Sequence, residues 1–326
     1  SMPKAGLHAR LGPGDGGIVL SAHADVVPVE GQDWARPAFT LTRDAHRLYG
    51  RGTTDMKGFL AAMLATAEQA AGRDLRAPLQ LVISYDEELG CIGINRMREG
   101  LAPLLGRPEL CIVGEPTEMR ATIGHKGKRA WRARCHGQPG HSALAPLFRN
   151  ALHDAVDLVA ALRAIQADLA QTGPQDPAYG VPYSTVHVGT LHGGTALNIV
   201  PDRAELRFEL RHLAEDDPAA IEARIRAAAA AIAPDIEITE DFAYPGLAIA
   251  ADHPAVGLVQ ALSGQGGTTK VTYGTEAGIF AEMGIAAVVC GPGSMERDGH
   301  KADEGLDMAQ LAACEATLGR VVEHLA

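Results

Sequence analysis

Apolar segments of strand length alternate with helical segments in the first third of the chain, and this alternation restricts the fold more than any other feature. Residues 17–22, 79–85 and 110–113 are apolar along most of their length. Residues 59–71 are rich in Ala, Leu and Met and are expected to form a helix, and 286–290 form a further apolar strand near the C-terminus. Apolar strands that alternate with helices indicate a buried, largely parallel sheet. The sequence therefore predicts an α/β domain.

Side chains of metal-binding type come near the ends of these segments. His23, Glu88 and Glu115 each follow one of the three apolar strands of the N-terminal third. His300 lies in the loop after the C-terminal strand, and Asp55 begins the helix. In open α/β sheets the ligand crevice lies beyond the carboxyl ends of the strands. We therefore expect these side chains to meet at that edge of the sheet.

The types of these side chains indicate which metal they would hold. Two imidazoles and three carboxylates form a set of ligands that suits Zn²⁺ or Co²⁺. Five protein ligands are too many for one tetrahedral zinc ion, but they suit two metal ions that share a bridging carboxylate and a water molecule. This count predicts a hydrolase with two metal ions in its active site.

Two more carboxylates stand beside the candidate ligands. Asp25 lies two residues after His23, on the same side of an extended chain, and can hold the second nitrogen of the imidazole. Glu87 precedes Glu88, so one side chain can bind metal while the other faces the metal-bound water. Repulsion between adjacent carboxylates raises the pKa of one of them, which suits a general base.

Each of these residues also has an ordinary structural interpretation. A strand-end hydrogen bond would explain His23 and Asp25, a helix N-cap would explain Asp55, and an exposed acidic turn would explain Glu87 and Glu88. Only the joint pattern favours a metal site.

The middle of the chain follows a different pattern. It predicts a strand, a long helix, two strands and an Ala-rich helix, at residues 129–136, 150–169, 184–191, 204–211 and 219–233. Apolar and charged residues alternate clearly through 204–211. This order indicates an α+β sandwich inserted into the α/β domain. We expect a catalytic domain of residues 1–120 and 239–326, and an inserted domain of residues 121–238.

Composition argues against several classes of partner and location. The formal net charge of −11 argues against nucleic acid or an anionic membrane surface as partner. No apolar run approaches about 20 residues, the length of a membrane-spanning helix. The first residues, Ser1-Met2-Pro3-Lys4, lack the features of a signal peptide. The five cysteines are scattered without a CxxC pair, which predicts reduced thiols, a cytoplasmic protein and no cysteine-bound zinc.

Six segments together resemble the M20 metallopeptidase family in order and spacing, over nearly the whole chain. They are residues 21–28, 50–58, 86–90, 114–116, 140–142 and 300–304. The Gly-Arg-Gly-x-x-Asp-Met-Lys-Gly stretch and the Asp-Glu-Glu are the most specific of them. The resemblance implies a zinc-peptidase-like catalytic domain and an inserted ferredoxin-like domain that serves for dimerisation and as a lid. It also implies two Zn²⁺ or Co²⁺ ions per chain and a homodimer.

The resemblance gives each candidate ligand a place. Asp55 would bridge the two metal ions. His23 and Glu115 would share one ion, while Glu88 and His300 would share the other.

The resemblance also assigns roles around the metals. Glu87 would be the general base, and Asp25 would orient the neighbouring histidine ligand. His141 would polarise the scissile carbonyl, often from the other subunit of the dimer. Asn198 and Arg211 resemble substrate-binding residues, although a turn residue and a strand-face charge would explain them equally well.

Within the family, residues 18–58, 273–278 and 289–293 resemble the acetylornithine deacetylases more than the succinyl-diaminopimelate desuccinylases. This implies hydrolysis of N2-acetyl-L-ornithine to L-ornithine and acetate, a step of arginine biosynthesis. Glu118 and Glu276 are the candidate partners for the ammonium group of such a substrate.

Two alternatives stay open. The first is another amidohydrolase of the same family, of the desuccinylase, aminoacylase or dipeptidase type. The second is a non-catalytic dimeric scaffold, which the presence of every ligand and of the base disfavours.

Two features depart from the family pattern. Its members carry several tens of residues before this starting point, so we expect outer helices of the catalytic domain to be missing. The loop 294–299 is slightly longer than the resemblance leads us to expect.

Overall fold

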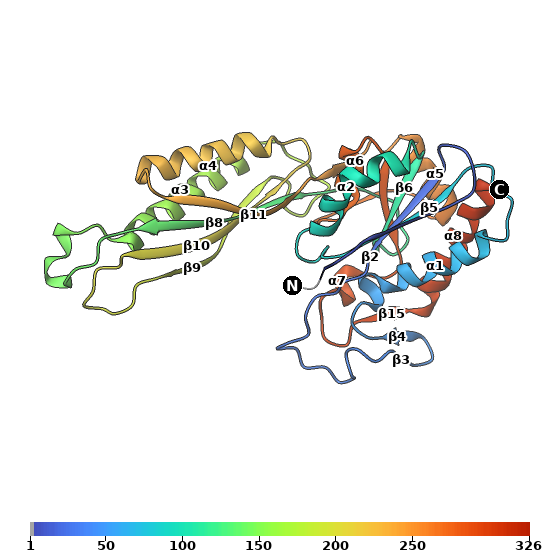
Figure 1. Ribbon diagram of the computed structural model, residues 1–326, viewed down its shortest axis with the longest axis horizontal. Helices are drawn as coiled ribbons and strands as arrows, with labels where there is room; N and C mark the ends of the chain where they lie inside the picture. Colours follow the sequence, from blue (N-terminus) through green and yellow to red (C-terminus); the bar gives the residue numbers. More distant parts are fainter. Residues whose placement is uncertain (1–2) are drawn as a thin grey trace. The chain divides into compact units, whose positions relative to one another are not determined.

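A computed structural model of the chain describes residues 3–326 and divides into two compact units (Figure 1). One unit comprises the chain up to His125 together with Leu247–Ala326, and the other is Lys126–Gly246. We expected the second unit to begin at residue 121. It begins later, at Lys126, because the strand 122–125 pairs within the sheet of the first unit. It extends beyond residue 238 because the strand that contains this residue continues to Tyr244. Ser1 and Met2, which belong to the N-terminal stretch considered above, lie outside the described residues.

The first unit contains an eight-stranded sheet in the order β1-β5-β2-β6-β14-β7-β12, with β13 paired to β7. Strand β2 runs parallel to both β5 and β6, and β14 runs parallel to β6. The central strands are therefore parallel, as the apolar segments predict. The strands are β1 (Leu7–Leu11), β2 (Ile18–His23), β5 (Leu79–Ser84), β6 (Leu110–Pro116), β7 (Thr122–His125), β12 (Leu247–Ala248), β13 (Thr269–Val271) and β14 (Ala287–Gly291).

Helices lie on both faces of this sheet (Figure 1). Ile18, Leu20 and Ala22 of β2 face the buried side chains of α1, α5 and α8. Ser21, which alternates with them, instead donates a hydrogen bond to Glu276 at the start of α6. By the same alternation, His23 points to the α6 side of the sheet. The helices are α1 (Gly58–Ala70), α2 (Ile92–Leu105), α5 (Pro254–Ser263), α6 (Ala277–Glu282), α7 (Met295–Asp298) and α8 (Met308–Leu325).

A small three-stranded sheet completes the first unit. It has the order β15-β4-β3, with β3 (Thr42–Arg43), β4 (Arg47–Tyr49) and β15 (Gly305–Asp307). Because β15 pairs with β4, the segment after His300 lies beside the segment that leads to Asp55. This pairing brings together two candidate ligands from opposite ends of the chain.

The second unit has the element order β8-α3-β9-β10-α4-β11, which is that of the ferredoxin-like fold. Its four strands form one antiparallel sheet in the order β11-β8-β10-β9. The alternation predicted for 204–211 is confirmed, because Leu206, Phe208 and Leu210 are buried; the ring of Phe208 stacks on Trp131 with 5.4 Å between centroids. The elements are β8 (Gly127–His136), η2 (Ser142–Leu147), α3 (Ala151–Thr172), β9 (Thr185–Gly193), β10 (Arg203–His212), α4 (Pro218–Ile232) and β11 (Glu237–Tyr244).

The five cysteines are all buried and none forms a disulfide, which agrees with the expected reduced thiols. Within residues 3–326, no helix has both the length and the apolar character that a membrane crossing requires.

Candidate active site

All the candidate metal ligands lie in the first unit, at the carboxyl ends of its central strands or in nearby loops. His23 is the last residue of β2, and Glu88 lies in the turn after β5. Asp55 lies in the irregular turn η1 (Thr53–Lys57) that leads into α1, and His300 follows α7. Glu115 was expected after its strand, but it lies within β6. Pairing between β6 and β14 continues through a bulge, and β6 extends three residues beyond the expected end at residue 113.

Asp55 lies between the two histidines. One carboxylate oxygen, Oδ1, is 3.1 Å from Nε2 of His23, and the other, Oδ2, is 3.1 Å from Nε2 of His300. The residue is 4% exposed, so this carboxylate is almost entirely removed from solvent. One buried carboxylate thus presents a separate oxygen to each imidazole.

Each imidazole has a second carboxylate partner. Nε2 of His23 is 3.7 Å from Oε1 of Glu115, and Nε2 of His300 is 3.2 Å from Oε2 of Glu88. The cluster therefore consists of two imidazole–carboxylate pairs on either side of Asp55. Two cation sites that share the central carboxylate would match this arrangement.

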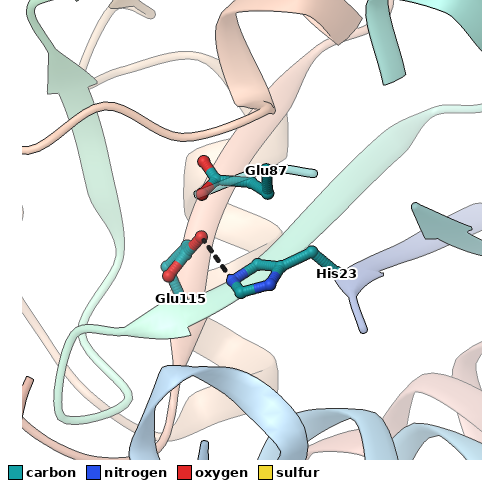
Figure 2. A group of neighbouring side chains, drawn as sticks. All are labelled: His23, Glu87 and Glu115. Carbon is teal, nitrogen blue, oxygen red and sulfur yellow. Dashed lines mark ion pairs between the residues drawn. The ribbon is translucent and has the colours of Figure 1, made fainter. Parts of the chain in front are cut away.

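The distances and the partners of these side chains fit metal ions. Ligand-type atoms of His23, Glu87 and Glu115 lie within 4.8 Å of one another (Figure 2), as do those of His23, Asp55 and Glu88. Among the described residues, Oε1 of Glu88 is buried without a hydrogen-bond partner. A buried polar atom of this kind requires a donor or a cation. A metal ion at this cluster would satisfy it.

The electrostatics of the cluster favour added positive charge. Burial opposes protonation of His23, but hydrogen bonds to Asp25 and Asp55 raise its pKa well above the usual value. Hydrogen bonds to Asp55 and Glu88 raise the pKa of His300 to about 10. Burial raises the pKa of Glu115 well above its usual range, and nearby carboxylates add to this effect. The cluster thus retains protons, and divalent cations would displace those held by the ligands.

Asp25 links His23 to the turn that carries the acidic pair. We expected its carboxylate to hold the imidazole, but the closer contact is with its backbone, since Nδ1 of His23 donates to the carbonyl oxygen of Asp25 at 3.0 Å. The nearest carboxylate oxygen is 3.5 Å from Nδ1. The carboxylate instead accepts hydrogen bonds from the backbone N–H groups of Glu87 and Glu88, each at 3.2 Å. A proton on Nδ1 leaves Nε2 as the metal-binding nitrogen.

Glu87 projects from its turn toward His23 and Glu115 (Figure 2). Burial and nearby carboxylates together raise its pKa to about 8, against the opposing effect of His23. A carboxyl group with a pKa near neutrality can both take up and release a proton, which suits acid–base chemistry. The thiol of Cys91 also donates a weak hydrogen bond to Oε1 of Glu87 at 3.3 Å.

The two candidate partners for a substrate ammonium group differ in accessibility. Glu276 is 1% exposed, and its carboxylate oxygens accept hydrogen bonds from Ser21 and Ser84, so it is not open to a substrate. Glu118 is exposed and lines a pocket of about 510 Å³ together with Tyr273. The contacts of Glu276 with Ser21 and Ser84, which lie far from it in the chain, were not visible in the sequence.

The other predicted site residues lie in the second unit. His141 is exposed, and a short bridge pairs it with Ile199, which brings it beside Asn198. Nδ1 of His141 accepts a hydrogen bond from the backbone N–H of Ala143 at 3.1 Å. Asn198 lies before the start of β10, whereas Arg211 lies near the C-terminal end of this strand. The guanidinium group of Arg211 donates hydrogen bonds to Glu209 and to the hydroxyl of Tyr244. The structure thus brings together His141 and Asn198, but not Arg211.

Sequence reasoning missed Glu304. Its side chain is buried and accepts hydrogen bonds from the backbone N–H groups of Thr54 and Asp55. The signals that pointed to it were its closeness in sequence to His300 and its place in the segment 300–304, which resembles the M20 family.

Comparisons with known proteins agree with this geometry. The profile of "Peptidase family M20/M25/M40" matches residues 19–324. The acetylornithine deacetylase of Pectobacterium atrosepticum is 32% identical over 332 residues, which cover 99% of this chain and 84% of that protein. The acetylornithine deacetylase of Yersinia pseudotuberculosis is 33% identical over 318 residues, which cover 96% of this chain and 80% of that protein.

Solved structures show the same fold. The M20 family metallo-carboxypeptidase Sso-CP2 from Sulfolobus solfataricus has a TM-score of 0.79 at 18% identity, covering 98% of this chain and 87% of that chain. The Bacillus subtilis YXEP protein, a dinuclear metal binding peptidase from the M20 family, has a TM-score of 0.67 at 15% identity, covering 98% and 85%. The chain therefore belongs to peptidase family M20/M25/M40, and it is a metallohydrolase that acts on amide bonds.

Proposed function

We propose that the protein removes the acetyl group of N2-acetyl-L-ornithine, giving L-ornithine and acetate. The placement of Asp55 between His23 and His300 is the observation that carries the chemistry, because it matches one carboxylate shared by two metal ions. The acetylornithine deacetylases, similar to this chain at 32% and 33% identity, support the choice of substrate.

In this proposal the five ligand residues hold two divalent metal ions, with zinc or cobalt as the ions that suit their donor atoms. Asp55 serves both ions, while His23 and Glu115 serve one and Glu88 and His300 serve the other. When bound, the two ions supply Lewis-acid polarisation of the amide carbonyl and a lowered pKa of water.

Glu87 moves the proton in the proposed reaction. It takes a proton from the attacking water as the new C–O bond forms, and it gives that proton to the amine nitrogen as the C–N bond breaks. Burial raises the pKa of the Glu87 carboxyl group above its usual range, which favours uptake and return of the proton by the same group. The carboxylate of Asp25 holds the turn that carries Glu87, because it accepts hydrogen bonds from the backbone N–H groups of Glu87 and Glu88.

His141 polarises the carbonyl oxygen of the substrate in this proposal, and Asn198 binds the substrate beside it. The hydrogen bond that Nδ1 of His141 accepts from Ala143 supports this role. A neutral imidazole with its acceptor at Nδ1 carries its proton on Nε2, which is then free to donate to an oxyanion. We further propose that the protein is a homodimer in which each second unit supplies His141 to the site of its partner. Arg211 serves as a further substrate-binding residue in the proposal.

Mixing two inactive variants tests the shared site. We expect Glu87→Gln and His141→Ala each to lose most activity alone. Exchanging subunits between them should restore activity, because a mixed dimer combines an intact Glu87 in one chain with an intact His141 from the other. Acetate release before and after subunit exchange measures this. If mixing restores no activity although mass measurements show mixed dimers, His141 acts within its own chain.

The substrate is tested by comparing kcat/KM for several N-acyl amino acids with zinc or cobalt bound. We expect N2-acetyl-L-ornithine to exceed its N2-succinyl counterpart, N-succinyl-diaminopimelate and dipeptides by about 10-fold or more, because a pocket shaped for acetyl cannot bind a larger acyl group equally well. A preference for a succinyl substrate or a dipeptide would assign the chain to another activity of its family.

A further inference from the structure

The carboxylate of Glu304 holds the loop that carries Asp55. Oε1 accepts hydrogen bonds from the backbone N–H groups of Thr54 at 2.9 Å and Asp55 at 3.0 Å. Oε2 accepts from the backbone N–H of Gly52 at 3.0 Å and from Nη1 of Arg51 at 2.7 Å. Glu304 is 1% exposed, so its carboxylate is shielded from bulk solvent. A single buried side chain therefore fixes the backbone on both sides of Thr53.

The same contacts join this loop to the segment that carries His300. The carbonyl oxygen of Glu304 accepts a hydrogen bond from the backbone N–H of Gly50 at 3.0 Å, and Nη1 of Arg51 also donates to the carbonyl of Lys301 at 3.3 Å. The guanidinium group of Arg51 is itself buried against the ring of Trp34. The loop that carries Asp55 and the segment that carries His300 are therefore joined at one buried ion pair between Arg51 and Glu304.

Asp25 forms a comparable contact elsewhere in the cluster. Its carboxylate accepts the backbone N–H groups of Glu87 and Glu88 and so ties their turn to the end of β2. Glu304 does the same for the loop of Asp55. Two ligand-bearing segments are thus each tied to another segment by a carboxylate that lies outside the proposed ligand set.

We propose that Glu304 is a positioning residue for the metal centre, which sets Asp55 and His300 at the spacing that metal binding requires. This inference rests on the proposed two-metal function. A backbone N–H that loses a buried acceptor must find another, and the loop then shifts. Because Asp55 contacts both imidazoles, such a shift would loosen both ion sites.

The substitution Glu304→Gln tests this proposal. An amide offers only one acceptor oxygen, and its NH₂ group would face N–H donors. We expect the affinity for zinc to fall about 10- to 100-fold, as for other residues that orient metal ligands. The visible absorption spectrum of the cobalt-loaded protein should also change, because it reports the geometry around the ion. The matched control is Asp303→Asn, whose carboxylate accepts hydrogen bonds from Ala35 and Arg36 instead; it should retain the wild-type affinity and spectrum.

A second variant covers the case in which Glu304→Gln does not fold. Glu304→Asp keeps the charge that Arg51 requires but shortens the side chain, so it cannot reach the donors of both Gly52 and Asp55. We expect it to bind zinc more weakly than the wild type. The melting temperature of each variant without metal reports any purely structural role separately.

The outcomes of these measurements distinguish the positioning role of Glu304 from the proposed two-metal function. If the wild-type chain binds no metal, the proposed function itself fails. If the wild type binds two ions and either folded Glu304 variant binds them with wild-type affinity and spectrum, the positioning role is wrong. A lower melting temperature with unchanged metal affinity would make Glu304 a structural residue only.

Discussion

Replacing Glu87 with Gln lowers kcat by about 10²- to 10⁴-fold, the contribution of a general acid–base group, while both metal ions stay bound. The amide has nearly the same shape as the carboxyl group but cannot take up a proton from water. The carboxylates that bind metal in our proposal are untouched, so metal content should stay at the wild-type value. Acetate release and zinc content measured on the same preparation check both parts of the prediction.

The control for this substitution is Glu99→Gln, the same chemical change at an exposed position of helix α2. It should leave kcat unchanged. If Glu87→Gln keeps wild-type turnover, another group moves the proton. If it loses turnover together with a metal ion, Glu87 is a ligand. That reading has some geometric support, because the residue lies as close to His23 and Glu115 as a shared ligand would.

Replacing Asp55 with Asn has the second large effect, and it acts through metal binding. The amide would place an NH₂ group against one of the two imidazoles and would remove the negative charge between them. We expect zinc affinity to fall by more than about 100-fold, beyond the usual effect of residues that only orient ligands. Turnover should fall with it. Equilibrium titration of the metal-free variant with buffered zinc measures the affinity.

The matched control for this variant is Asp252→Asn, an exposed aspartate before helix α5. It should bind zinc as the wild type does. If Asp55→Asn still binds two ions with wild-type affinity, Asp55 does not bridge them, and its contacts with His23 and His300 serve only the fold.

The fold was predictable where burial leaves a direct trace in the residue types. The central strands of the first unit are apolar on both faces because helices cover both, and the sequence alone showed this. The alternation of 204–211 likewise reflects a sheet with one covered face. The boundary at residue 121 was missed because β7 (Thr122–His125) has no pattern that tells which sheet it joins; its pairing with β14 decides that.

The candidate site was predictable in its residue types but not in its supporting contacts. His23 and Asp55 could be found because imidazoles and carboxylates recur near the ends of predicted strands and helices. The buried contacts of Glu304 and Glu276 were not predictable, since each depends on a partner more than 190 residues away in the chain. A charged residue in a loop is usually exposed, and only the packed structure shows that these two are not.

The measurement that tests the central claim most directly is a zinc titration of the metal-free chain, followed at each step by acetate release from N2-acetyl-L-ornithine. The account predicts that two zinc ions bind per chain and that activity is absent without metal and appears as they bind. Activity that persists after complete removal of metal, or a chain that binds no zinc at this cluster, would contradict it.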